Sequence, residues 1–196
     1  MNKDPHAPPL HGSLPPEGAR SALGRPGGGT SPAKIMLWWE DLQVGETRDL
    51  GTITPTEEET VAFARQFDPQ PFHLDHEAAK ASVFGALSAS GWHTCAMAMR
   101  LMVTNFLVHT SSLGSPGLES LKWLKPVFPG DTLRLQHTIT EKRAMSKRPD
   151  VGLVRTIWEM FNQNGDKVLH MEGYGMFRLK EPPRSAAARV AAPHGG

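Results

Sequence analysis

The segment from Trp92 to Val108 limits the folds open to this chain more than any other segment. Its apolar residues occur on nearly every side of a helix instead of along one stripe: Trp92, Cys95, Met97, Met99, Leu101, Met102, Phe106 and Leu107. A helix without a broad polar face is covered by other structure on most sides. In a membrane, Arg100 would lie at mid-bilayer at a cost of roughly 2.5–3.5 kcal/mol, and His93 and Asn105 would add to it. We therefore predict a long core helix and no membrane partner.

Strand-like segments precede and follow this helix in the sequence. One covers residues 46–53, and four more cover residues 118–126, 131–143, 151–161 and 167–179. Residues 162–166, Asn-Gln-Asn-Gly-Asp, are typical of a hairpin turn, and Pro129-Gly130-Asp131 indicates another turn. One strand, a long buried helix and a four-stranded antiparallel meander predict an α+β protein. The expected architecture is a single hotdog fold, an antiparallel sheet wrapped around a long central helix.

The two ends of the chain differ in composition from its middle. Residues 1–33 hold seven prolines and six glycines, too little apolar surface to offset the entropy of ordering the chain. Residues 183–196 are also rich in alanine, proline and glycine. We predict disordered tails at residues 1–33 and 183–196 and one folded domain at residues 34–182.

Charge and cysteine content exclude several classes of function. The chain has 196 residues and a formal net charge of +1, without the basic excess that a nucleic-acid surface needs. Cys95 is the single cysteine, so an internal disulfide is impossible, and the first residues lack the apolar stretch of a signal peptide. We expect a cytoplasmic protein that does not bind nucleic acid.

Residues 63–76 place a carboxylate and an imidazole around two prolines. Pro69 disfavours a helical conformation at Asp68, and Pro71 keeps the chain extended toward His73. An acid and a base on a stiff turn can hold one water between them, as the addition of water to an activated double bond requires. The alternative is that Asp68 only stops a helix and that His73 is structural.

Three motifs in the same order resemble the MaoC-like (R)-specific enoyl-CoA hydratases and dehydratases. Residues 68–75, Asp-Pro-Gln-Pro-Phe-His-Leu-Asp, are similar to the hydratase motif Asp-x-Asn-Pro-x-His-x-Asp of that family. Residues 90–93, Ser-Gly-Trp-His, stand where the family has the glycine that begins the central helix. Residues 125–131, Lys-Pro-Val-Phe-Pro-Gly-Asp, resemble its Pro-Val-x-x-Gly-Asp junction. The resemblance covers about residues 38–180.

The resemblance implies a hydro-lyase that acts on an acyl-CoA thioester. Asp68 and His73 would be the acid–base pair, and the N–H group of Gly91 would donate to the thioester oxygen, on which negative charge builds. Gly91 has an alternative role, because glycine also permits close packing at a helix start. The motifs further imply substrate contacts from Gln70, Phe72, Ser90 and Trp92. Gln70 replaces the asparagine of the family motif, which changes how its side chain can brace the turn.

The same resemblance predicts no metal or other cofactor and a homodimer or higher homo-oligomer. A single curled sheet also leaves an edge strand exposed, and pairing across a two-fold axis would satisfy it. The apolar surface to be covered is expected around Trp123 and Trp158.

Other functions remain open from the residues alone. His73-Leu74-Asp75 is also the His-x-Asp half of an iron-binding facial triad, with His93, His109, His137 or His170 as the third ligand. A hotdog thioesterase would hydrolyse the same kind of thioester, and a partner subunit would bind an acyl group without catalysis. The basic residues Lys142, Arg143, Lys147 and Arg148 form either a solvated surface or a contact to CoA phosphates.

Overall fold

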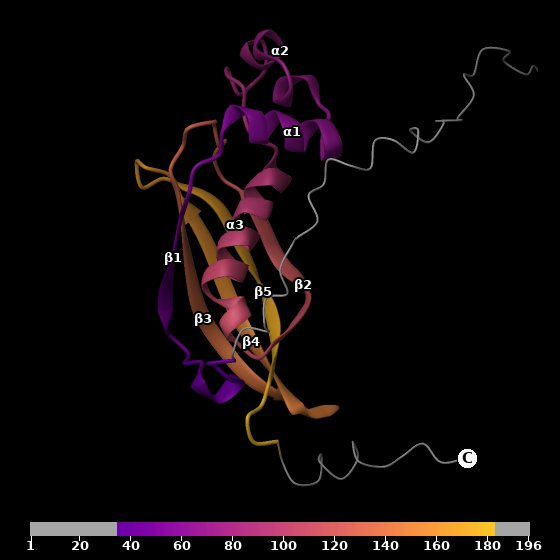
Figure 1. Ribbon diagram of the computed structural model, residues 1–196, viewed down its shortest axis with the longest axis vertical. Helices are drawn as coiled ribbons and strands as arrows, with labels where there is room; N and C mark the ends of the chain where they lie inside the picture. Colours follow the sequence, from indigo (N-terminus) through magenta and orange to yellow (C-terminus); the bar gives the residue numbers. More distant parts are fainter. Residues whose placement is uncertain (1–34, 183–196) are drawn as a thin grey trace, which may run out of the picture. The chain divides into compact units, whose positions relative to one another are not determined.

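The computed structural model describes residues 35–182 as one five-stranded sheet with helices on one side (Figure 1). The strands are β1 (Thr47–Ile53), β2 (Ser112–Trp123), β3 (Leu133–Met145), β4 (Arg148–Phe161) and β5 (Lys167–Arg178). The α-helices are α1 (Glu57–Phe67), α2 (His76–Lys80) and α3 (Gly91–Asn105). Three short 3-10 turns are η2 (Trp39–Asp41), η3 (Pro71–His73) and η4 (Leu107–His109). The tails predicted at residues 1–33 and 183–196 lie outside the described residues.

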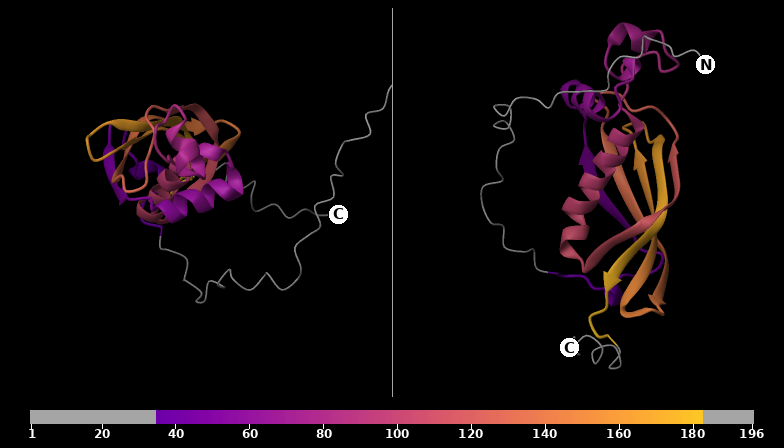
Figure 2. Two further views of the ribbon diagram at one scale, coloured as in Figure 1. Left: turned by 90° about the horizontal axis from the view of Figure 1, so that it is seen from above. Right: turned by 90° about the vertical axis from the view of Figure 1, so that its right-hand side faces the viewer.

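The sheet is fully antiparallel and has the strand order β1-β3-β4-β5-β2. Figure 2 shows α3 along one face of the curled sheet, with α1 and α2 beyond the N-terminal end of α3. This arrangement confirms the predicted hotdog fold.

The prediction of a four-stranded meander is wrong for β2. Only β3, β4 and β5 follow one another as neighbours, whereas β2 pairs with β5 on the far side of the sheet. The segment between β2 and β3 is no tight turn, because it holds Pro126 and Pro129 and runs beside the start of α3. There the carbonyl oxygen of Val127 accepts a hydrogen bond of 2.8 Å from the N–H group of Ala89.

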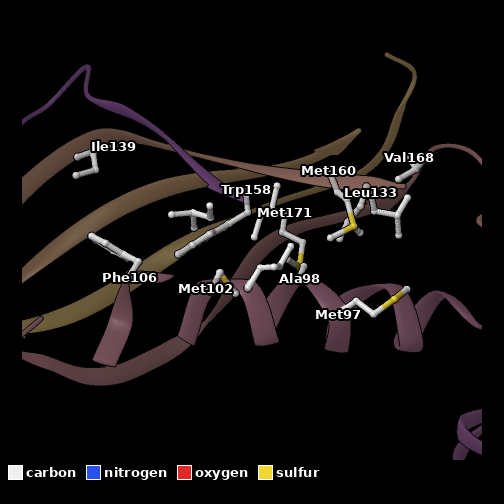
Figure 3. Close-up of a cluster of buried hydrophobic side chains, with 14 of the residues drawn as sticks. Met97, Ala98, Met102, Phe106, Leu133, Ile139, Trp158, Met160, Val168 and Met171 are labelled. Atoms are coloured by element: carbon white, nitrogen blue, oxygen red, sulfur yellow. The ribbon is translucent and has the colours of Figure 1, made fainter. Parts of the chain in front are cut away.

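The core lies between α3 and the sheet (Figure 3). Met97, Ala98 and Met102 on α3, and Phe106 directly after it, point toward apolar side chains of the sheet, among them Leu133, Ile139, Trp158, Met160, Val168 and Met171. Full burial of an aliphatic or aromatic side chain contributes about 1.5–3 kcal/mol, so this cluster holds α3 on the sheet. Trp158 is part of this core and not of the outer surface where we expected it.

One face of α3 is not covered by its own chain. Trp92, Met99 and Val103 are 57%, 50% and 39% exposed, so the prediction that other structure covers the helix on most sides is wrong for this face. The single sheet reaches only the opposite side of the helix. None of the helices between residues 35 and 182 is long and apolar enough to cross a membrane.

Candidate active site

Helix α1 brings Asp68 to the site. Thr56 caps the helix, since its hydroxyl accepts a hydrogen bond of 3.1 Å from the N–H of Glu59, and the Glu59 carboxylate accepts one of 3.1 Å from the N–H of Thr56. Asp68 is the C-cap residue and has left the helical conformation, with φ −151° and ψ 66°. This ending is the one that Pro69 predicted.

The 3-10 turn η3 buries the imidazole of His73. Its Nδ1 atom lies 2.7 Å from the carbonyl oxygen of Ser88. Because a carbonyl oxygen can only accept, Nδ1 carries a proton, and in the neutral ring the lone pair is on Nε2. The rings of Phe72 and Phe84 pack against the imidazole, with centroid distances of 4.6 and 6.1 Å. The orientation of His73 is thus fixed from two sides.

Asp68 and His73 come together as the sequence predicted. The Oδ2 atom of Asp68 lies 3.6 Å from Nε2 of His73. This distance is too long for a good direct hydrogen bond, but one water can contact both atoms. Burial raises the pKa of the Asp68 carboxyl, yet hydrogen bonds from Ser90 and Gln70 and the nearby His73 outweigh burial and hold the pKa below its usual value.

Two polar side chains hold the carboxylate of Asp68 in place. Gln70 Nε2 donates a hydrogen bond of 2.8 Å to Oδ1, and the Ser90 hydroxyl donates one of 2.7 Å to Oδ2. Gln70 therefore braces the turn despite its additional methylene group. Ser90 is fully buried, and its hydroxyl also accepts a hydrogen bond of 3.2 Å from the N–H of Trp92, which caps α3.

Gly91 is the first residue of α3, as predicted, and the indole of Trp123 lies against it. A Cβ atom at Gly91 would be 2.5 Å from the Trp123 ring, and Trp123 Nε1 donates a hydrogen bond of 2.9 Å to the Gly91 carbonyl oxygen. Close packing therefore requires glycine here. The N–H groups of this first helical turn carry the positive end of the helix dipole, which attracts negative charge.

A cavity of about 350 Å³ lies beside His73 and Gly91. Its other lining residues are Phe84, Ala89, Thr94 and residues 123–127. Of the predicted site residues, only His73 and Gly91 line this cavity. Asp68 lies next to His73 outside the lining, Gln70, Phe72 and Ser90 support Asp68 or His73, and Trp92 lines a second cavity. The sequence did not single out Thr94 and Trp123 as lining residues. The motif at residues 125–131 does place Lys125, Pro126 and Val127 here.

The second cavity measures about 380 Å³ and lies between α3 and the strands β2 and β5. Its walls are mainly apolar and include Trp92, Cys95, Met99, Leu118 and Leu121. Burial raises the pKa of the Cys95 thiol, and the neighbouring Trp123 side chain partly opposes that rise.

The residues of the alternative iron site, His73 and Asp75, make other contacts. His73 Nδ1 is occupied by Ser88, and the Asp75 carboxylate caps α2 by accepting a hydrogen bond of 2.8 Å from the N–H of Ala78. Among residues 35–182, no three His, Cys, Asp or Glu side chains form a group that could hold a metal ion.

The chain is similar to known proteins in sequence and in fold. The sequence profile described as "MaoC like domain" matches residues 41–158. The crystal structure of the MaoC-like dehydratase from Rhodospirillum rubrum is 39% identical, with a TM-score of 0.69, and the match covers 74% of this chain and 99% of that chain. The (R)-hydratase PhaJ1 from Pseudomonas aeruginosa is 25% identical, with a TM-score of 0.59, over 74% of this chain and 87% of that chain.

A third similar protein is the mesaconyl-CoA hydratase of Cereibacter sphaeroides. It is 32% identical over 81 residues, which are 41% of this chain and 23% of that protein. This chain therefore corresponds to less than a quarter of that hydratase.

Proposed function

This chain belongs to the MaoC-like domain family, and from that premise we propose that it is a hydro-lyase for an α,β-unsaturated acyl-CoA thioester. The proposal rests on one observation above all: the Asp68 carboxylate lies 3.6 Å from Nε2 of His73, and His73 lines a cavity beside the start of α3. Two similar proteins are named as hydratases, one of them for a CoA thioester, which supports the same reaction class here.

In the proposed reaction, Asp68 and His73 hold one water against the substrate. Both the carboxylate and Nε2 can accept a hydrogen bond from that water, which leaves an oxygen lone pair directed at the β-carbon. As the water attacks, a C–O bond forms, and one water proton passes to the acid–base pair. A proton delivered from the pair to the α-carbon completes the addition, and elimination follows the reverse course.

The negative charge of the enolate-like intermediate needs a donor that is already in place. We assign this role to the N–H of Gly91, where the helix dipole adds to the hydrogen bond. Gln70 and Ser90 keep the Asp68 carboxylate ionised and oriented. Phe72 and Trp92 are assigned to the substrate surroundings, Phe72 through its contact with His73.

An assay with crotonyl-CoA tests the proposal. Hydration removes the conjugated enoyl absorbance without releasing free thiol, whereas a thioesterase would release thiol from this or a saturated acyl-CoA. A non-catalytic partner subunit would do neither. We expect loss of the enoyl absorbance with no thiol; thiol release, or no reaction with any enoyl-CoA of a length series, would contradict the proposal.

A further inference from the structure

Trp123 separates the two cavities described above. Its side chain lines the cavity of about 350 Å³ beside His73, hereafter the catalytic cavity. The cavity of about 380 Å³ between α3 and β2/β5, hereafter the apolar cavity, is lined by Trp92. The ring of Trp92 packs edge to face against the other side of the Trp123 indole, with a centroid distance of 5.3 Å and an interplanar angle of 79°. Each of the two tryptophans therefore belongs to a different cavity while they touch one another.

The same boundary is visible along both elements that meet here. On α3, Thr94 lines the catalytic cavity and the next residue, Cys95, lines the apolar cavity. On β2, Leu121 lines the apolar cavity, and Trp123, two residues further on and on the same strand face, lines the catalytic cavity.

The indole is held in this position although it is 47% exposed. Its N–H donates to the Gly91 carbonyl oxygen at 2.9 Å, and its ring occupies the space where a side chain at position 91 would be. A group fixed at both its polar atom and its ring face acts as a wall, because displacing it breaks a hydrogen bond and opens a gap over the helix start.

We propose that Trp123 selects for short acyl chains by closing the catalytic cavity toward the apolar cavity. The inference rests on the proposed function, since the acyl chain must leave the reacting carbons beside His73 and Gly91. A long chain would gain about fourfold in affinity for each methylene group that it buried in apolar surroundings. With the indole of Trp123 in place, a long acyl chain meets this aromatic wall and does not reach the apolar cavity.

Binding of saturated thioesters tests this selection without any chemistry. Butanoyl-CoA and decanoyl-CoA are titrated calorimetrically into the full chain and into its Trp123→Ala, Trp123→Leu and Trp123→Phe variants. We expect the parent to bind butanoyl-CoA more tightly, and Trp123→Ala to raise the affinity for decanoyl-CoA relative to butanoyl-CoA by about tenfold or more. Trp123→Phe retains a ring and should change the ratio least. Trp123→Leu replaces the alanine variant if the latter does not fold.

Trp38→Ala is the matched control, because Trp38 is a half-buried tryptophan that lines neither cavity. An unchanged ratio in the alanine and leucine variants, or a parent that prefers decanoyl-CoA, would overturn the inference. Rates of hydration of the matching enoyl thioesters separate this failure from failure of the proposed function. A parent that hydrates them with the same length ratio as its variants rejects only the inference. A parent that shows the length selection in binding but hydrates no thioester rejects only the hydro-lyase.

Discussion

At the scale of single residues, Asp68 and His73 carry the first prediction. Asp68→Asn and His73→Gln should each lower turnover by a factor of about 100 or more, as expected when an acid–base group is lost. Stopped assays with crotonyl-CoA measure the rate, and circular dichroism checks the fold. His76→Gln is the matched control, because His76 is an exposed histidine paired with Glu57 at 2.9 Å. Near-normal rates in both site variants would remove the assignment.

The second prediction at this scale concerns Gln70. Its amide donates to Asp68 Oδ1, and this bond is one reason why the pKa of Asp68 lies below its usual value. Gln70→Leu should raise that pKa, so the carboxylate is protonated at a higher pH. The acidic limb of kcat/KM should therefore move to higher pH, while the rate at pH 8 changes less. Gln43→Leu, which removes a surface amide bonded to the Glu40 carbonyl oxygen, should leave the profile in place.

How far the site could be predicted differs between these residues. Prolines stiffen the chain locally and can be identified from the sequence. The prolines beside Asp68 correctly predicted that α1 ends there and that the imidazole of His73 lies near the carboxylate. The contact of Ser90 with Asp68 joins positions 22 residues apart, and that of Trp123 with Gly91 joins positions 32 apart. Local patterns give no distance for such pairs, because tertiary packing sets them.

At the scale of elements, the strands were predictable in kind but not in partner. Alternation and turn residues indicated the β3–β4–β5 meander, including the hairpin with Gly165 at φ 80°. For β2, alternation and turn residues are equally compatible with β3 and with β5 as the neighbouring strand. Its pairing with β5 depends on the crossing segment that packs beside Ala89, and this is a long-range contact.

The start of α3 supplies the third prediction. Gly91→Ala places a methyl group 2.5 Å from the Trp123 ring, which must move or push α3 away. Overpacking of this kind typically costs about 1–3 kcal/mol in the free energy of unfolding. Urea unfolding measures it. In the double variant Gly91→Ala, Trp123→Ala the clash is absent, so the double-mutant cycle should show a coupling of comparable size. Additive effects would mean that the indole does not restrict position 91.

At the scale of the whole molecule, the core holds a titratable group. His137 is fully buried between the rings of Phe106 and Trp158, at 4.7 and 4.3 Å, and neither ring nitrogen has a hydrogen-bond partner among residues 35–182. Burial and, to a smaller extent, the positive charge of Arg48 together lower the pKa of His137 to about 4. Below pH 6.5 the unfolded chain takes up a proton that the folded chain refuses until about pH 4.

Stability should therefore fall as pH falls through this window, and this is the fourth prediction. Between pH 7.5 and 5.0, His137 should account for a loss of about 2 kcal/mol in the free energy of unfolding. His137→Leu removes the imidazole. Between pH 7.5 and 5.0 the free energy of unfolding of this variant should therefore fall less than that of the parent, whatever the variant's stability at pH 7.5. His76→Gln should lose as much as the parent. Equal losses in all three proteins would show that His137 is not desolvated in solution.

The last prediction is that the chain works as a homodimer or a higher homo-oligomer. One sheet covers only one side of α3, which leaves Trp92, Met99 and Val103 exposed, and β2 is an edge strand with no second partner within residues 35–182. A second copy could cover the helix face and the strand edge together.

Such assembly would be required for activity if the acyl-CoA site lies near the subunit boundary, as the exposed Trp92 and Trp123 beside Gly91 suggest. Val103→Lys should weaken association by introducing a charge into the apolar face, whereas Thr104→Lys, at the next and already exposed position, should not. Sedimentation of dilute enzyme during turnover compares the two. Activity should fall in step with dissociation, and Val103→Lys should dissociate and lose activity at a lower dilution than Thr104→Lys. A fully active monomer at any dilution would contradict both the assembly and the shared site.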